Sequence, residues 1–148
     1  MVFGDALLEA HEIEVGLANT PRVVLAPSAK ECVLKHMEYY ASPKASPQNI
    51  EVLRDVDGEL FVNYLMDFDS GYPEAPGLAP QELQAHKLAV ENRLRQFASN
   101  PKVASKYSWV GAYHNFFCRR FMGARRRSMS INGGLLTKKW ASPSLIVR

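Results

Sequence analysis

The stretch that decides the fold is 51-EVLRDVDGELFVNYLM-66. Two runs of alternating apolar and polar residues flank the pair Asp57-Gly58, and this pattern is the strongest short-range signal for a β-hairpin. Phe61, Asn63 and Leu65 fall on one face of the second strand, because successive side chains of a strand point to opposite faces. The chain is therefore expected to contain a sheet built around residues 52–66.

The residues before the hairpin predict a helix, a strand and a second helix. Apolar residues recur at helical spacing over 6–17. Residues 21–27, PRVVLAP, form a short apolar run closed by proline at both ends, which suits a buried strand, although the chain offers it no obvious neighbour. Ser28 is expected to cap a helix that runs to about residue 40, with Glu31 completing a capping box.

The residues after the hairpin predict two helices. Pro80 can begin a helix that extends to about Phe97, since proline fits the first helical turn. Residues 106–121, KYSWVGAYHNFFCRRF, form an aromatic-rich helix in which Trp109 and Tyr113 are expected to lie in the core. From residue 123 onward no period is visible, and this segment is expected to include disorder.

The element order predicts an α+β fold. We expect a partial sheet of about three strands with flanking helices and a C-terminal helical extension. The expected organisation is an α+β domain over 1–70, a helical extension over 71–122 and a basic tail over 123–148.

The charge is divided sharply along the chain. All 15 acidic residues lie at or before Glu91, so that residues 1–92, with six Lys and Arg, carry −9, whereas residues 93–148 carry +12. Such asymmetry is typical of contact with nucleic acid or a membrane surface. It also fits a basic end that folds back on the acidic body or pairs with an acidic partner.

The composition argues for a soluble, cytoplasmic protein. No apolar run approaches the ~20 residues of a membrane-spanning helix, so no membrane partner is expected. The first seventeen residues contain acids and no Lys or Arg, unlike a secretory signal. The 2 cysteines, Cys32 and Cys118, are expected to be reduced thiols.

Several segments together resemble a known family. FGDALLEAHEIE (3–14), TPRVVL (20–25), the hairpin and KYSWVGAYHN (106–115) are similar to segments of bacterial class III nucleotide cyclase-like proteins, which carry FGPAL, AYELE, YPRI and KY.WL..YHN. Some relatives of this kind are pyrimidine cyclases that signal in antiphage defence. The resemblance covers roughly Val2 to Phe117 and corresponds to the C-terminal half of a cyclase domain, whose sheet is ferredoxin-like.

The resemblance also implies what this segment lacks. The two metal-binding aspartates of the family lie in the first half of the domain, with which no part of this chain aligns. Mg or Mn is therefore expected only in a full-length relative, and no cofactor is expected here. The transition-state asparagine and arginine of the family correspond to Leu8 and Glu12, which cannot take those roles. No catalytic residue is assigned, and whether the chain is an enzyme stays open.

Two possible metal sites are not favoured by the sequence. Cys32 and His36, with His114 and Cys118, form two pairs spaced by four residues that could close a zinc site, but the pairs are so remote in sequence that ordinary helix residues are the favoured interpretation. The acids around residues 55–69 lack the ligand spacing of a calcium loop.

The densest positive cluster is 119-RRFMGARRR-127. Its arginines could bind phosphate while Tyr107, Trp109, Tyr113 and Phe117 stack on bases, but the favoured interpretation is that the aromatic residues lie in the core and the arginines form a solvated helix end. The candidate ligand or partner contacts are His114, Asn115, Arg119, Arg120, Arg125, Arg126 and Arg127.

Two functions follow as hypotheses. In the first, the chain is a partial or degenerate cyclase-homology protein, inactive alone, that acts by oligomerisation in cyclic-nucleotide or antiphage signalling, with a homodimer as the expected state. In the second, it is a non-enzymatic interaction module whose basic end binds an acidic partner or nucleic acid. We expect any nucleic-acid binding to be weak and indifferent to sequence.

Overall fold

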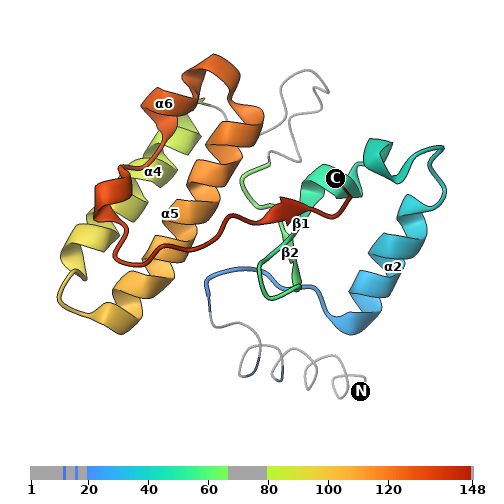
Figure 1. The fold of residues 1–148 in the computed structure, drawn as a ribbon, viewed down its shortest axis with the longest axis horizontal. Coiled ribbons are helices and arrows are strands. Elements are labelled where there is room, and N and C mark those ends of the chain that lie inside the picture. Colours follow the sequence, from blue (N-terminus) through green and yellow to red (C-terminus); the bar gives the residue numbers. More distant parts are fainter. Residues whose placement is uncertain (1–11, 13–15, 17–19, 67–79, 148) are drawn as a thin grey trace, which may run out of the picture. The chain divides into compact units, whose positions relative to one another are not determined.

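The computed structural model describes residues 12, 16, 20–66 and 80–147 (Figure 1). The chain divides into two units, one of Met1–Asn63 with Pro143–Arg148 and one of Tyr64–Ser142. The first carries a small antiparallel sheet and the second is helical, so the α+β prediction is confirmed. Most of the predicted helix over 6–17 and the loop over 67–79 lie outside the described residues.

The predicted hairpin is present in the first unit. Strand β1 (Val52–Arg54) pairs antiparallel with β2 (Leu60–Val62), with Leu53 opposite Phe61. The turn requires Gly58, whose φ of 88° lies in the left-handed region that residues with a Cβ avoid. Leu53 and Phe61 are fully buried, as the alternation predicts.

The third strand of the sheet comes from the end of the chain. Strand β3 (Ser144–Leu145) pairs antiparallel with β1, which gives the order β2-β1-β3. The buried side chain of Asn49 fixes this strand, because its amide donates to the Val147 carbonyl at 3.2 Å and its oxygen accepts from the Val147 N–H at 2.8 Å. The sequence contained no signal for this pairing.

The apolar run at 21–27 has a neighbour, contrary to the expectation. The Leu25 N–H donates to the Leu60 carbonyl at 2.8 Å, and the Val62 N–H donates to the Val23 carbonyl at 2.9 Å. The contact is one antiparallel bridge, Val24 to Phe61, and does not extend into a full strand. Pro21 and Pro27 explain this limit, since proline has no N–H to contribute to a ladder.

Helix α2 (Pro27–Met37) covers part of the sheet in the first unit. Leu25, Val52 and Leu60 form a buried cluster against which Ala29, Val33, Val62 and Ile146 pack. The expected cap at Ser28 is wrong: the helix begins one residue earlier at Pro27, with Ala26 in the capping position. Proline is pre-organised for the first helical position, which accounts for the shift. A 3-10 turn (Pro43–Ala45) and α3 (Gln48–Glu51) lead from α2 to β1.

The second unit is built on two helices that pack together. Helix α4 (Pro80–Gln96) matches its predicted bounds closely, whereas α5 (Pro101–Phe121) begins five residues before the predicted start. Asn100 caps α5 by accepting from the Val103 N–H at 3.3 Å. Trp109 and Tyr113 are buried as predicted. No helix of the described residues is long and apolar enough to cross a membrane.

The structure differs from the expectation for the basic tail. Residues 123–147 contain η2 (Gly123–Arg125), α6 (Arg126–Met129), η3 (Gly133–Leu135) and β3. No period was visible because Ile131 and Leu136 pack individually onto α5 and belong to no long helix. The tail is also shared, since residues up to Ser142 belong to the second unit and the rest to the first, whereas one separate tail was expected.

Candidate anion-binding site

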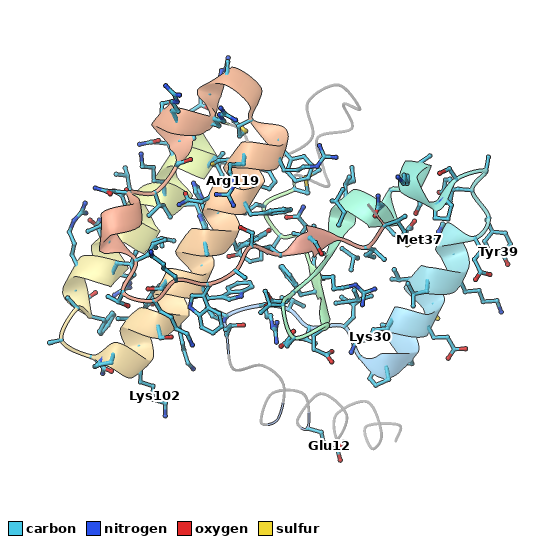
Figure 2. All side chains as sticks on the ribbon, in the orientation of Figure 1. Glu12, Lys30, Met37, Tyr39, Lys102 and Arg119 are labelled. Atoms are coloured by element: carbon cyan, nitrogen blue, oxygen red, sulfur yellow. The ribbon has the colours of Figure 1, made fainter. Side chains whose placement is uncertain are left out.

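A hollow lined by arginines lies at the C-terminal end of α5. Its lining residues are Arg119, Gly123, Ala124, Arg126 and Arg127, and its volume is about 460 Å³. These residues belong to α5, η2 and α6 of the second unit, and Figure 2 labels Arg119 on this part of α5. The hollow therefore brings together three of the five arginines that the sequence singled out.

Gly123 makes this arrangement possible. Helix α5 closes with the Met122 N–H donating to the Cys118 carbonyl at 3.1 Å, and Gly123 follows in the left-handed region with a φ of 50°. A glycine in this conformation is the usual way to end a helix and redirect the chain. The reversal lets η2 and α6 carry Arg126 and Arg127 to the same hollow as Arg119.

The arginines of this cluster are exposed. Arg119 donates to the Ser142 hydroxyl at 2.6 Å, and Arg120 lies over the Phe121 ring, 5.6 Å from its centroid. Within the described ranges, none of the arginines between Arg119 and Arg127 forms an ion pair with a carboxylate. The predicted contact with acidic surface of the same chain is thus not seen among the described residues.

The residues that follow the arginines are held by side chains of α4 and α5. We call residues 128–132 the strap. Lys87 donates to the Ser128 carbonyl at 2.9 Å, and the Asn132 N–H donates to Glu91 at 3.3 Å. Asn115 donates to the Ile131 carbonyl at 3.1 Å and accepts from its N–H at 2.7 Å. The strap fixes the position of α6, and hence of the arginines on it.

Two predicted contact residues prove to bind the protein itself. His114 is fully buried, and its Nε2 lies 2.9 Å from the Met129 carbonyl of the strap. Asn115 uses both ends of its amide on Ile131. Tyr113, the residue before them, accepts from the Leu65 N–H at 3.0 Å. The polar atoms of His114 and Asn115 are therefore engaged in orienting the strap and are not directed to a ligand.

A second histidine completes the contacts of His114. The Nδ1 atoms of His86 and His114 are 3.0 Å apart, and the ring planes are within 5° of parallel with centroids 5.1 Å apart. Because a carbonyl only accepts, Nε2 of His114 must carry a proton, which leaves Nδ1 of the neutral ring as an acceptor. His86 must then donate from Nδ1, so the pair is joined by an N–H···N bond.

Burial keeps this histidine pair neutral. Removal from water and, to a smaller extent, the nearby His114 together lower the pKa of His86 to about 4. Burial also lowers the pKa of His114, against an opposing effect of the bond to Met129. Burial raises the pKa of the neighbouring Cys118 thiol to about 11. The two histidine rings and the Cys118 thiol are therefore uncharged at neutral pH.

The other predicted candidates lie apart from this site. Leu8 is outside the described residues, and Glu12 is exposed. Cys32 and His36 lie on α2 of the first unit, whereas His114 and Cys118 lie on α5 of the second. No group of three or more potential metal ligands occurs in the described part of the chain.

Base stacking has little support in the described structure. Of the four aromatic residues named as possible platforms for bases, Trp109, Tyr113 and Phe117 are at most 1% exposed and fill the core of the second unit. Tyr107 is half-buried and stacks on Phe97, with ring centroids 6.0 Å apart. Stacking needs an accessible ring face, so the three buried side chains cannot serve.

Sequence reasoning missed His86 as a functional partner. It lies on the apolar stripe of α4 with Leu83, Val90 and Leu94, all of which are buried. A histidine on such a stripe must find a polar partner inside the protein, and that was the available signal. Only the packing of α4 on α5 identifies the partner as His114.

Comparisons with known proteins give this chain no relative: no family model, no curated protein and no solved structure matches it.

Proposed function

We propose that this chain is a binding module that holds an anionic partner on the arginine-rich end of its second unit. The observation that carries the proposal is the hollow between Arg119, Arg126 and Arg127, whose arginines have no carboxylate partner in the described structure. Arginine presents a planar fork of donors that suits carboxylate and phosphate groups.

The proposed mode of binding is recognition of charge and not of base sequence. Contacts with phosphate carry no sequence information, and Trp109, Tyr113 and Phe117, three of the four aromatic residues named as possible platforms for bases, are buried in the second unit. Binding by charge alone weakens steeply as salt is added, because it depends on the release of counterions.

The test is a titration with labelled polyanions at two salt concentrations. Polyglutamate and single- and double-stranded oligonucleotides are the probes, and anisotropy is the readout. We expect binding that falls as salt rises and does not depend on oligonucleotide sequence. No binding of any polyanion at low salt would refute the proposal, and salt-resistant binding to one sequence would replace it with specific nucleic-acid recognition.

A second proposal concerns origin: the chain is a partial cyclase-homology protein that does not turn over nucleotides alone. One observation favours it, since residues 23–25, α2 and the hairpin follow one another in the order that the resemblance implies. Incubation of the protein with each of the four nucleoside triphosphates and manganese should give no cyclic product. Product that disappears on mutation of this chain would refute the proposal.

The cyclase interpretation also implies self-association, because cyclases of that family place their sites between two subunits. We therefore propose a homodimer as the working state. Light scattering at increasing concentration is the direct measurement, and a monodisperse monomer at the highest concentration would contradict it.

A further inference from the structure

We propose that the hollow between Arg119, Arg126 and Arg127 is a site for a single phosphomonoester group. This inference rests on the proposed function, because it names the chemistry that the anionic partner presents to the arginines. It adds that one phosphate with three free oxygens is the unit of recognition, and that a small phosphorylated molecule suffices for binding.

The number of guanidinium groups favours this ligand. Three arginines line one hollow. A carboxylate has two oxygens and one negative charge, which a single arginine fork already satisfies. A phosphomonoester offers three acceptor oxygens and about −1.5 to −2 charges at neutral pH, so it can engage all three arginines at once.

The other two lining residues leave room for the ligand. Gly123 has no side chain and Ala124 has only a methyl group, so nothing bulky enters the hollow from η2. No heavy atom lies within 4 Å of the position that a Cβ on Gly123 would occupy. A volume of about 460 Å³ is larger than a phosphate requires and accommodates the group to which it is attached.

Three hydrogen bonds hold Arg119 and the backbone of Arg126 and Arg127 in place before binding. Arg119 is oriented by its bond to the Ser142 hydroxyl at 2.6 Å. The backbone that carries Arg126 and Arg127 is fixed because Ser130 bonds the Arg126 carbonyl at 2.6 Å and Lys87 bonds that of Ser128 at 2.9 Å. Groups that are already ordered lose less freedom when a ligand binds, which favours affinity.

The experiment titrates the full chain with a nucleoside 5′-monophosphate and follows backbone amide signals by NMR. The matched nucleoside, inorganic phosphate and a dinucleoside phosphodiester are the comparison ligands. We expect the monophosphate and inorganic phosphate to shift the signals of Gly123 and Ala124. The nucleoside should shift neither, and the diester should bind more weakly because it has one charge and two free oxygens.

A matched pair of double variants locates the site. Arg119→Gln with Arg126→Gln removes two charges from the hollow and should weaken monophosphate binding roughly tenfold or more. Lys102→Gln with Lys106→Gln removes two exposed charges from the other end of α5, which Figure 2 marks at Lys102. Lys102 is about 25 Å from Arg119 along the helix axis, beyond the screening length at physiological salt, so affinity should stay within about twofold.

Three results would overturn the inference: no shift at Gly123 and Ala124 with millimolar monophosphate, equal binding of monoester and diester, or equal loss in the two double variants. If polyanions bind while the monophosphate does not, only this inference fails. If neither binds, the proposed function fails with it.

Discussion

Among the described residues, each unit holds a cluster of ionisable side chains in its interior, and the two clusters are stabilised in opposite ways. In the first unit, Arg22 pairs with Asp55 and Asp57 at the turn of the hairpin, and the side chains of Arg22 and Asp55 are both 3% exposed. In the second unit, His86 and His114 share an N–H···N bond. The first cluster is charged and stable through opposite charges, whereas the second is stable because it stays neutral.

The pKa shifts follow from this difference. Burial alone would lower the pKa of Arg22, but its bonds to Asp57 and Asp55 outweigh burial and raise it. The bond to Arg22 lowers the pKa of Asp57. In the histidine pair, burial lowers both pKa values and no carboxylate opposes it strongly enough. Acid is therefore expected to disturb the two units over different pH ranges.

The largest effect is expected from removing the cation of the first cluster. Arg22→Met leaves the buried Asp55 carboxylate without the Arg22 cation, and breaking a buried pair in this way costs about 3–5 kcal/mol of unfolding free energy. Urea unfolding followed by far-UV circular dichroism, with amide exchange of β1 and β2, measures the loss in the first unit.

The control for this change is Arg54→Met, which removes a partly exposed arginine from the same hairpin. We expect it to cost less than about 1 kcal/mol. Adding Asp55→Asn to Arg22→Met should recover part of the stability by removing the uncompensated charge. Equal losses for Arg22→Met and Arg54→Met would show that the buried cluster is not what stabilises the hairpin.

An intermediate effect is expected from acid acting on the histidine pair. The folded pKa of about 4 for His86 is below its value of 6.5 in the unfolded chain, so the unfolded state binds more protons between these limits. Stability of the second unit should fall by about 1–3 kcal/mol as pH drops from about 6.5 to 4, and level off below. Both tryptophans, Trp109 and Trp140, belong to this unit, so their fluorescence reports it selectively.

Other groups around the pair enter this measurement. Lys87 and Glu91 on α4 act electrostatically on His114, and the Tyr64 ring lies against His86 with centroids 6.0 Å apart. Two substitutions are compared. His86→Gln retains a donor for His114 and should reduce the slope of unfolding free energy against pH. His36→Asn, at an exposed position of α2, should not change that slope. A slope unaffected by His86→Gln would assign the acid sensitivity to other groups.

The first unit should respond to acid only at lower pH. The lowered pKa of Asp57 stabilises the fold above about 3.8, and this contribution is lost as pH falls through the folded value. Amide exchange of the hairpin should therefore be unchanged across the range in which tryptophan fluorescence already reports loosening.

The smallest effects are expected from two glycines that need the same conformation in different units. Gly58 has a φ of 88° and Gly123 one of 50°. Neither position would bring a Cβ within 4 Å of another atom, so an alanine should cost only backbone strain, about 1 kcal/mol in each case. Gly123→Ala should shift the unfolding curve measured by tryptophan fluorescence, whereas Gly58→Ala should act mainly on hairpin exchange. Equal shifts of the fluorescence curve would mean that the two units unfold as one.

Much of the fold follows from local signals in the sequence. Asp57-Gly58 between alternating runs predicts the hairpin, because only glycine adopts the turn conformation without strain. Pro80 and the apolar spacing after it predict α4, and the aromatic residues at positions 109 and 113 predict the buried face of α5. The arginine cluster is likewise visible in the sequence.

Other features depend on contacts between residues far apart in the chain. Asn49 accepts a hydrogen bond from Val147, 98 residues away, and so positions β3. No periodicity in the sequence marks a strand of two residues. The residue types of His114 and Asn115 suggested ligand contacts. In the structure their side chains bind backbone atoms of the strap instead. A side chain's polarity shows that it needs a partner but not which partner it has.

The sequence by itself determined the hairpin, the two long helices, and the concentration of positive charge after residue 92, since each depends on conformational preference or composition within a few residues. The tertiary structure alone decided that Arg119, Arg126 and Arg127 line one hollow and that His86 contacts His114. The physical reason is that these contacts join residues far apart in the chain. The arginines meet only because Gly123 redirects the chain after α5, and the histidines meet only because α4 packs on α5.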